Sequence, residues 1–318
     1  MTRPPIAFDR TTGRLDGASV LERCAALALQ AGSKASAPFG RRGFSLGCRL
    51  VASVLAEHEI VLQLNEDARF AFPFGDGYWS LLLDRGFTYE RDVERFLRAV
   101  AGADYTFIDC GANFGYWSVL VSSRPFGGHR VIAIEPSAAN VARLARNAAL
   151  NGSRFEVVQR AIGAEPGRAR LRGDKHEALR ITDDTAGPTG EWVDVIALDS
   201  LLDQGVIAPG QPLVVKLDVE GAEIAAIEGG RRLFGTSAVL IAEDHGSDRS
   251  HAVSRFILSE TPYRPFVFDP QTNRVEPLDR LDMLDRIKAN PAIGYNVFAA
   301  TGPLWEERIR SMPSLARH

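Results

Sequence analysis

One stretch, residues 105–151, restricts the fold of this chain more than any other. It begins YTFIDCGANFGYWSVLV, which predicts a short strand followed by a loop of the pattern D-x-G-x-N-x-G over residues 109–115. Glycine adopts positive φ without steric cost and asparagine tolerates it better than most residues, so such a loop suits close approach of the backbone to a ligand. We expect a helix over residues 116–123 whose free N–H groups face that ligand.

A second strand is expected over residues 131–134, and it ends in Glu135. An acid at this point of a βαβ unit is positioned to accept hydrogen bonds from both hydroxyls of a ribose. The loop lacks the G-x-G-x-x-G spacing of dinucleotide sites, and Asp109 suits an ammonium group better than a pyrophosphate. S-adenosylmethionine has an adenosine, an ammonium group and no phosphate, so it fits this unit better than a nicotinamide cofactor.

Composition limits the class of partner. The chain has 318 residues, enough for one large domain with an appendage, and a formal charge of −3. A nucleic-acid or membrane-surface partner would favour a basic protein, so neither is expected. Three scattered cysteines, and no recognisable signal peptide or membrane span, predict a cytoplasmic protein. The scarcity of lysine beside arginine suggests a GC-rich bacterial genome. The oligomeric state stays open.

The first 88 residues are expected to form an extension that covers the pocket or an edge of the sheet. Residues 1–50 are weakly patterned, with a short amphipathic helix over 20–29, and residues 59–74 alternate as a β-hairpin. Arg41 and Arg42 either are solvated or reach an anionic substrate. Tyr78 and Tyr89 are candidate substrate contacts, although aromatic residues at such places usually belong to the core.

The remaining strands are expected in a domain over residues 89–302. A third strand over 155–162 brings Ala161 towards an adenine ring, and residues 163–173 and 193–198 are predicted as extra strands. Strands over 213–217 and 238–242 are followed by an antiparallel pair over 263–268 and 295–300. Residues 303–318 are predicted to be a tail with a surface helix.

Charged residues gather at the ends of two of these strands. Lys216, Asp218 and Glu220 close one, and Glu243 and His245 follow the other. Charges at the end of a buried strand are costly unless they are paired or used, and parallel sheets bind ligands at this edge. Lys216 either pairs internally or contacts substrate.

A general base for a hydroxyl acceptor is expected among these residues, and His245 is the best of them by its ordinary pKa. In an alternative arrangement Asp218, Glu243 and His245 hold a divalent cation that acidifies the hydroxyl. We favour the reaction without a metal, since nothing in the spacing requires one.

With both regions considered, the sequence resembles the FkbM-type family of S-adenosylmethionine-dependent O-methyltransferases. The matching segments are FIDCGANFGYWSVL, IAIEPS with the downstream NAALNG, LDSLL, VKLDVEGAE and LIAEDH. The resemblance implies a doubly wound, seven-stranded, Rossmann-like sheet whose last strand is antiparallel. It also implies that the acceptor is a hydroxyl of a sugar, glycoconjugate or other secondary metabolite. The cofactor contacts it implies, together with those from strand position, are Asp109, Gly111, Asn113, Gly115, Glu135, Ala161 and Asp218.

Two other function classes remain as alternatives. A nicotinamide-dependent oxidoreductase is disfavoured by the glycine spacing, and a non-catalytic nucleoside-binding scaffold by the charges at Asp218, Glu220, Glu243 and His245. A nucleic-acid methyltransferase would need a basic face and an N/D-P-P-Y-type tetrad, which the sequence lacks. The expected partner is therefore a small-molecule or glycan acceptor.

Overall fold

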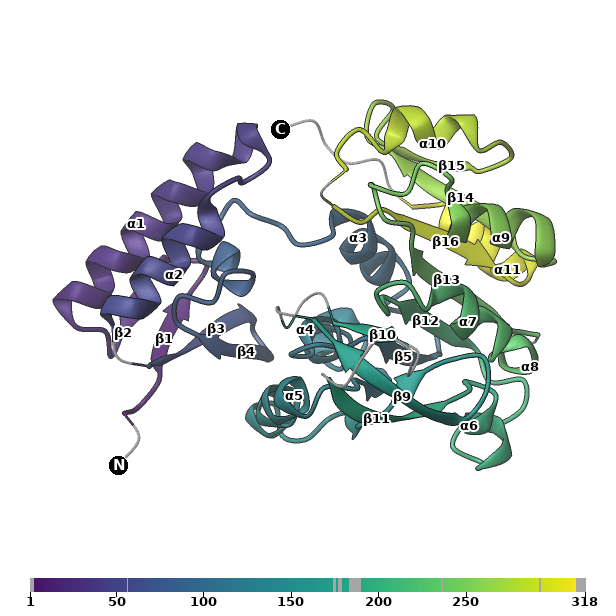
Figure 1. Cartoon of the computed structure of the whole chain (residues 1–318), viewed down its shortest axis with the longest axis horizontal. Coiled ribbons are helices and arrows are strands. Elements are labelled where there is room, and N and C mark those ends of the chain that lie inside the picture. Colours follow the sequence, from purple (N-terminus) through teal and green to yellow (C-terminus); the bar gives the residue numbers. More distant parts are fainter. Residues whose placement is uncertain are drawn as a thin grey trace.

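The computed structural model describes residues 3–55, 57–173, 176, 179–182, 190–235, 237–291 and 293–312. Its central element is an eight-stranded sheet in the order β15-β14-β16-β13-β12-β5-β6-β7 (Figure 1). The strands are β5 (Thr106–Cys110), β6 (Arg130–Ile134), β7 (Glu156–Val158), β12 (Leu213–Leu217), β13 (Ala238–Glu243), β14 (Arg264–Asp269), β15 (Arg274–Pro277) and β16 (Asn296–Ala300).

The predicted number of seven strands is wrong by one. β5, β6, β7, β12 and β13 pair in parallel, and β16, the last strand of the chain, is antiparallel to both of its neighbours as expected. The additional strand is β15, which pairs with β14 as an antiparallel hairpin at the edge. Its sequence, RVEP, is short and polar, because an edge strand of a hairpin needs no apolar run.

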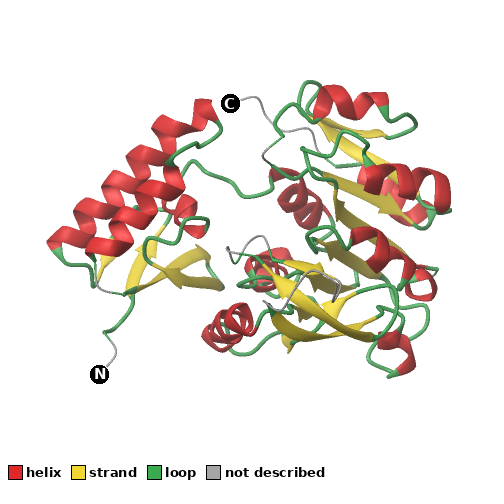
Figure 2. Ribbon diagram, in the orientation of Figure 1, coloured by secondary structure: helices red, strands yellow, loops and turns green. Residues whose placement is uncertain are grey.

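Helices cover both faces of the sheet (Figure 2), so the doubly wound arrangement is confirmed. Both faces need cover because successive residues of a strand point to opposite sides and both sides are apolar. In β12, Val214 belongs to one hydrophobic cluster and Val215 to the other, and both are fully buried. One face carries α3 (Arg91–Ala99), α4 (Tyr116–Val121), α5 (Ala138–Leu150) and α11 (Pro303–Arg310). The other carries α6 (Ser200–Asp203), α7 (Glu223–Glu228), α8 (Arg231–Phe234), α9 (Ala252–Glu260) and α10 (Asp282–Ile287).

A small sheet in the order β10-β9-β11-β8 lies beyond β7 in the sequence. Its strands are β8 (Ala161–Ile162), β9 (Gly167–Arg172), β10 (Arg180–Thr182) and β11 (Glu191–Ile196). The predicted third strand over residues 155–162 is therefore divided between two sheets. The N–H of Arg160 turns back onto the Val158 carbonyl at 3.2 Å, which ends β7 and redirects the chain.

The N-terminal part is more regular than its sequence indicates. A sheet in the order β2-β1-β3-β4 is covered by α1 (Val20–Ser36) and α2 (Phe44–Val54), at the left of Figure 1. Its strands are β1 (Ile6–Asp9), β2 (Leu15–Asp16), β3 (Glu59–Asn65) and β4 (Ala68–Pro73). The hairpin is confirmed, and the helix predicted over residues 20–29 is present but continues to Ser36. A capping box of Ser19 and Glu22 starts α1, and the helix continues past Gly32 with Ser33 on its buried face.

The N-terminal sheet is joined to α5 through polar side chains. Asn147 accepts from the Ala71 N–H at 2.7 Å and donates to the Ala71 carbonyl at 3.1 Å. Asn151 does the same for Arg69, at 2.9 and 2.7 Å. These amides satisfy the outer edge of β4, which would otherwise carry unpaired backbone groups. The described part of the chain also contains three 3₁₀ turns: η1 (Ala37–Phe39), η2 (Trp79–Leu83) and η3 (Arg124–Phe126).

Cys24, Cys48 and Cys110 are all free. Within the described part of the chain, no helix combines the length and the apolar character that crossing a membrane requires. The helix predicted in the tail is α11, whose Trp305 and Ile309 are buried, and the residues after 312 lie outside the described part.

Candidate functional site

The carboxyl ends of the parallel strands β5, β6, β12 and β13 meet at one edge of the sheet, where a cavity of about 850 Å³ opens. All but one of the predicted site residues line this cavity. They are Tyr78, Tyr89, Asp109, Gly111, Asn113, Glu135, Ala161, Lys216, Asp218, Glu220, Glu243 and His245. The exception is Gly115.

The two glycines of the loop are required for different reasons. Gly111 has φ of +78°, and a Cβ there would lie 1.8 Å from the carbonyl oxygen of Asp218. Gly115 has φ of +86° and precedes α4, and a Cβ there would lie 2.4 Å from Leu144 of α5. Gly111 therefore sets how closely the loop meets the end of β12, whereas Gly115 sets the packing of α4 and α5.

Asn113 holds the tip of the loop in place. Its φ is +52°, and its backbone N–H donates to Glu135 Oε2 at 2.9 Å. Its side chain accepts from the Trp79 indole at 3.2 Å and donates to the carbonyl of His176 at 2.9 Å. The loop is thus held in place by polar groups from three separate segments of the chain.

Glu135 is buried and already accepts three hydrogen bonds. Besides Asn113, the donors are the Ser137 N–H at 3.0 Å and the Asn140 side chain at 3.2 Å. Burial raises the pKa of Glu135, against the effect of these hydrogen bonds. A carboxylate offers about four acceptor positions. One remains, which is enough for one hydroxyl of a ribose rather than for the two that we expected.

Asp109 and Lys216 face each other across β5 and β12, in register. Asp109 accepts from Ser118 Oγ at 2.6 Å, and burial raises its pKa to about 6 against the opposing charge of Lys216. Lys216 is only 3% exposed and its ammonium lies 2.7 Å from Asp218 and 3.5 Å from Glu90. Burial alone would lower the pKa of Lys216, but the carboxylates around it raise that pKa well above its usual value. The internal ion pair considered for Lys216 is therefore present.

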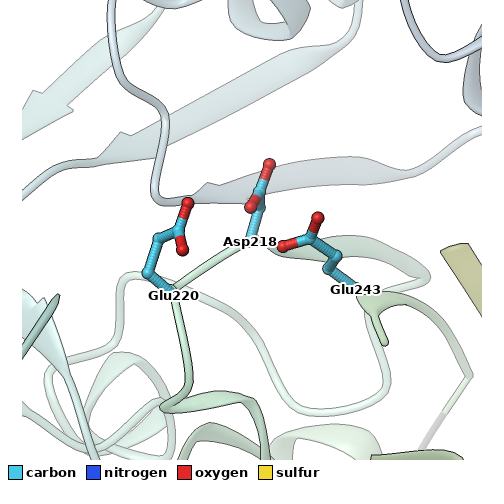
Figure 3. A group of neighbouring side chains, drawn as sticks. All are labelled: Asp218, Glu220 and Glu243. Atoms are coloured by element: carbon cyan, nitrogen blue, oxygen red, sulfur yellow. The ribbon is translucent and has the colours of Figure 1, made fainter. Parts of the chain in front are cut away.

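Three carboxylates gather where β12 and β13 end (Figure 3). Asp218 and Glu220 follow β12 and Glu243 ends β13; one oxygen of each lies within 4.8 Å of the others. We call these three residues the carboxylate group. Burial, followed by the charge of Asp218, raises the pKa of Glu243 to about 10, so the group holds a proton at neutral pH. The spacing also suits oxygen ligands of a divalent cation.

His245 is not part of this group, which differs from the alternative metal set of Asp218, Glu243 and His245. The Nδ1 atom of His245 accepts from the Ser247 N–H at 3.2 Å and lies 2.7 Å from its Oγ. The neutral ring then carries its proton on Nε2, as inferred from this contact. In this orientation the imidazole has no free lone pair with which to accept a proton from a hydroxyl.

Aromatic side chains form another wall of the cavity. The hydroxyl of Tyr78 donates to that of Tyr89 at 2.8 Å, and burial raises the pKa of both phenols well above the usual value. Trp79 packs edge-on against Tyr89, with ring centroids 5.4 Å apart. Both tyrosines therefore stay protonated and present hydrogen-bonding hydroxyls within an apolar wall.

Sequence reasoning missed three residues beside the carboxylate group. Asn296 opens β16 opposite Glu243 and donates to Glu90 at 3.2 Å and Asp92 at 3.5 Å. Burial raises the pKa of Asp92 to about 6. A Cβ at Gly294 would lie 1.5 Å from Glu243, so this glycine makes room for the carboxylate. The sequence held one signal for these residues: Asn296 is a polar residue at the start of β16, which is otherwise apolar.

The fold and the site define the class: an open α/β protein with a ligand site at the carboxyl ends of its parallel strands. Residues 109–265 match the methyltransferase FkbM domain. The chain therefore carries a methyltransferase FkbM domain, and the resemblance noted in the sequence is confirmed. No curated protein is a significant match.

Solved structures of methyltransferases are also similar. The methyltransferase FkbM from Methylobacillus flagellatus KT aligns with 62% of this chain and 43% of its own, at 19% identity and a TM-score of 0.39. The chain therefore spans less than half the length of that relative. The O-methyltransferase from Bacillus cereus in complex with SAH aligns with 68% of this chain and 83% of its own, at 15% identity and a TM-score of 0.38. An rRNA methylase from Streptococcus thermophilus aligns with 67% of this chain and 98% of its own, at 13% identity and a TM-score of 0.37.

Proposed function

We propose that this methyltransferase uses S-adenosylmethionine to methylate a hydroxyl of a sugar, glycoconjugate or other secondary metabolite. The observation that carries the proposal is that one cavity contains both a nucleoside-type loop and, at its other strand ends, the carboxylate group. The family match favours this reading over the oxidoreductase and the scaffold considered from the sequence.

The residues present fit the cofactor. Gly111 lets the loop lie close against the end of β12, and Glu135 retains one acceptor position for a ribose hydroxyl. Asp109 supplies a carboxylate for an ammonium group, and buried Ala161 offers an apolar surface for an adenine. When bound, S-adenosylmethionine supplies an electrophilic methyl group on a sulfonium that is already a good leaving group.

The protein must align the acceptor and remove its hydroxyl proton. We assign removal of the hydroxyl proton to the carboxylate group, because Asp218 and Glu220 lie within 4.8 Å of Glu243 and offer carboxylate oxygens as acceptors beside the one that keeps its proton at neutral pH. His245 was the preferred base by its ordinary pKa, but Ser247 occupies its Nδ1. Because His245 lines the cavity, its Nε2–H is suited to donate a hydrogen bond to the acceptor instead.

A divalent cation bound by the same three carboxylates would acidify the same hydroxyl, and turnover in EDTA separates the two routes. The reaction itself is tested by incubating the protein with methyl-labelled S-adenosylmethionine and a panel of sugars, glycosides and phenols. We expect label on oxygen in at least one hydroxyl compound. Label found only on nitrogen or carbon acceptors would overturn the assignment to a hydroxyl.

A further inference from the structure

Two arginines on the wall of the cavity have no role in the reaction described so far. Arg41 lies in the loop between η1 and α2, and Arg91 is the first residue of α3. The Arg41 guanidinium lies 4.5 Å from the centre of the Phe87 ring. The same loop faces Asn290, because a Cβ at Gly40 would lie 3.7 Å from its side-chain nitrogen. None of these neighbours comes from the βαβ unit that holds the glycine loop.

Neither guanidinium has a hydrogen bond or ion pair to the described residues, and the Nε of Arg41 is buried without a partner. The nearby Asp84 is engaged by the Ser33 hydroxyl and the Gly86 N–H. Burial lowers the pKa of Arg41, and the charge of Arg91 lowers it further against that of Asp84. Buried donors without partners and neighbouring like charges both cost free energy.

The other arginines that line this cavity are paired. Arg160 lies 3.8 Å from Asp194 and Arg180 lies 3.9 Å from Glu220. Arg41 also has a positive φ of 57°, a backbone conformation that a side chain of its kind rarely adopts. Arg41 thus combines a strained backbone with a guanidinium that lies over a ring and has no carboxylate partner among the described residues, which suits an anion that the protein does not itself provide.

We propose that Arg41 and Arg91 bind a phosphate group of the acceptor, so that the enzyme methylates a phosphorylated hydroxy compound. This inference rests on the proposed function. A phosphate carries nearly two negative charges at neutral pH and several acceptor oxygens, which two guanidiniums match in planar, paired hydrogen bonds. The carboxylate group repels the same phosphate. The acceptor is therefore oriented with its anion at the arginines and its neutral hydroxyl at the carboxylates.

The cavity suits two ligands. Its volume of about 850 Å³ lies at the upper end of the range for small-molecule sites. Arg41 and Arg91 come from the N-terminal part and from α3, whereas the cofactor contacts come from β5, β6 and β8. Loss of the arginine pair is therefore expected to leave cofactor binding unchanged.

The test is calorimetric titration of the full chain, loaded with S-adenosylhomocysteine, with pyrophosphate and separately with acetate. We expect pyrophosphate to bind and its affinity to fall at least tenfold in both Arg41→Gln and Arg91→Gln. Arg42→Gln is the matched control, since Arg42 is exposed in the same loop but lies outside the cavity lining. Its affinity for pyrophosphate should equal that of the wild type.

Affinity for S-adenosylhomocysteine, measured on every variant, reports folding and the cofactor site independently of the anion. Wild-type protein that binds the nucleoside but not pyrophosphate would overturn the phosphate site and leave the methyltransferase proposal standing. Equal weakening in Arg42→Gln, or acetate binding as tight as pyrophosphate, would also contradict it. Failure of the nucleoside itself to bind would count against the proposed function instead.

Discussion

Replacing Gly111 by alanine tests how tightly the cofactor loop is fitted to the end of β12. Gly111 and Gly128 both have positive φ, +78° and +64°, but only Gly111 has backbone within reach of an added Cβ. Gly128→Ala is therefore a matched control that measures the conformational cost alone, about 1–2 kcal/mol of unfolding free energy.

At Gly111 the added Cβ would lie 1.8 Å from the Asp218 carbonyl oxygen, whereas real Cβ contacts almost never fall below 3.0 Å. Loop and strand end must separate by about 1 Å, and overpacking of this kind adds about 1–3 kcal/mol. We expect Gly111→Ala to lose about 2–5 kcal/mol in urea unfolding. The same displacement should lower turnover by roughly 100-fold, because it separates cofactor loop and carboxylate group.

The measurements are urea unfolding and initial rates of methyl transfer on both variants. Gly128→Ala should keep wild-type turnover once correction is made for any unfolded fraction. If Gly111→Ala matched Gly128→Ala in both stability and turnover, the close approach described for Gly111 would be refuted.

Four further substitutions test single groups. Glu135→Gln should weaken S-adenosylhomocysteine binding by about 10- to 150-fold, since a hydrogen bond to a charged group is worth about 1.5–3 kcal/mol; unchanged affinity in calorimetry would remove Glu135 from the site. Asp218→Asn should abolish methyl transfer at retained nucleoside affinity, whereas His245→Ala should keep measurable turnover; the reverse order would return the base to His245. Glu243→Gln should flatten the pH dependence of stability. The pKa of Glu243 is raised from 4.5 to about 10, so its stabilising contribution is complete below pH 4.5 and is lost as pH rises towards 10. Urea unfolding at several pH values checks this, and equal slopes for both proteins would contradict it.

The sequence predicted best those parts that short-range pattern determines. β12 begins and ends at the residues that we expected, Leu213 and Leu217. The glycine loop and Glu135 also lie together at the strand ends, because consecutive strands of a βαβ unit are adjacent in the sheet. Local chemistry thus located the cavity.

Features that depend on distant partners were missed. β15 is a strand only because β14 is beside it, and α1 persists to Ser36 because its buried face packs on the N-terminal sheet. The composition of the carboxylate group depends on where side chains turn after β12 and β13, which spacing does not specify. Glu220 has φ of +53° and joins the group, while His245 turns to Ser247.

The structure also explains how a cavity so rich in acids is tolerated. Lys216 neutralises part of the charge of Asp218 and Glu90, and Glu243 keeps its proton at neutral pH. A site with these properties favours a cationic methyl donor and a neutral hydroxyl at the same place. The asymmetry between this end and the arginine pair is what gives the proposed acceptor its orientation.

The central claim is that the loop over residues 109–115 and Glu135 bind the nucleoside of S-adenosylmethionine. Calorimetric titration of the wild-type protein with S-adenosylhomocysteine, beside an identical titration with NAD⁺, tests it most directly. We predict saturable binding of S-adenosylhomocysteine at one site per chain and none of NAD⁺. Binding of NAD⁺ in preference, or no binding of either by folded protein, would contradict the assignment of this cavity to a methyl donor.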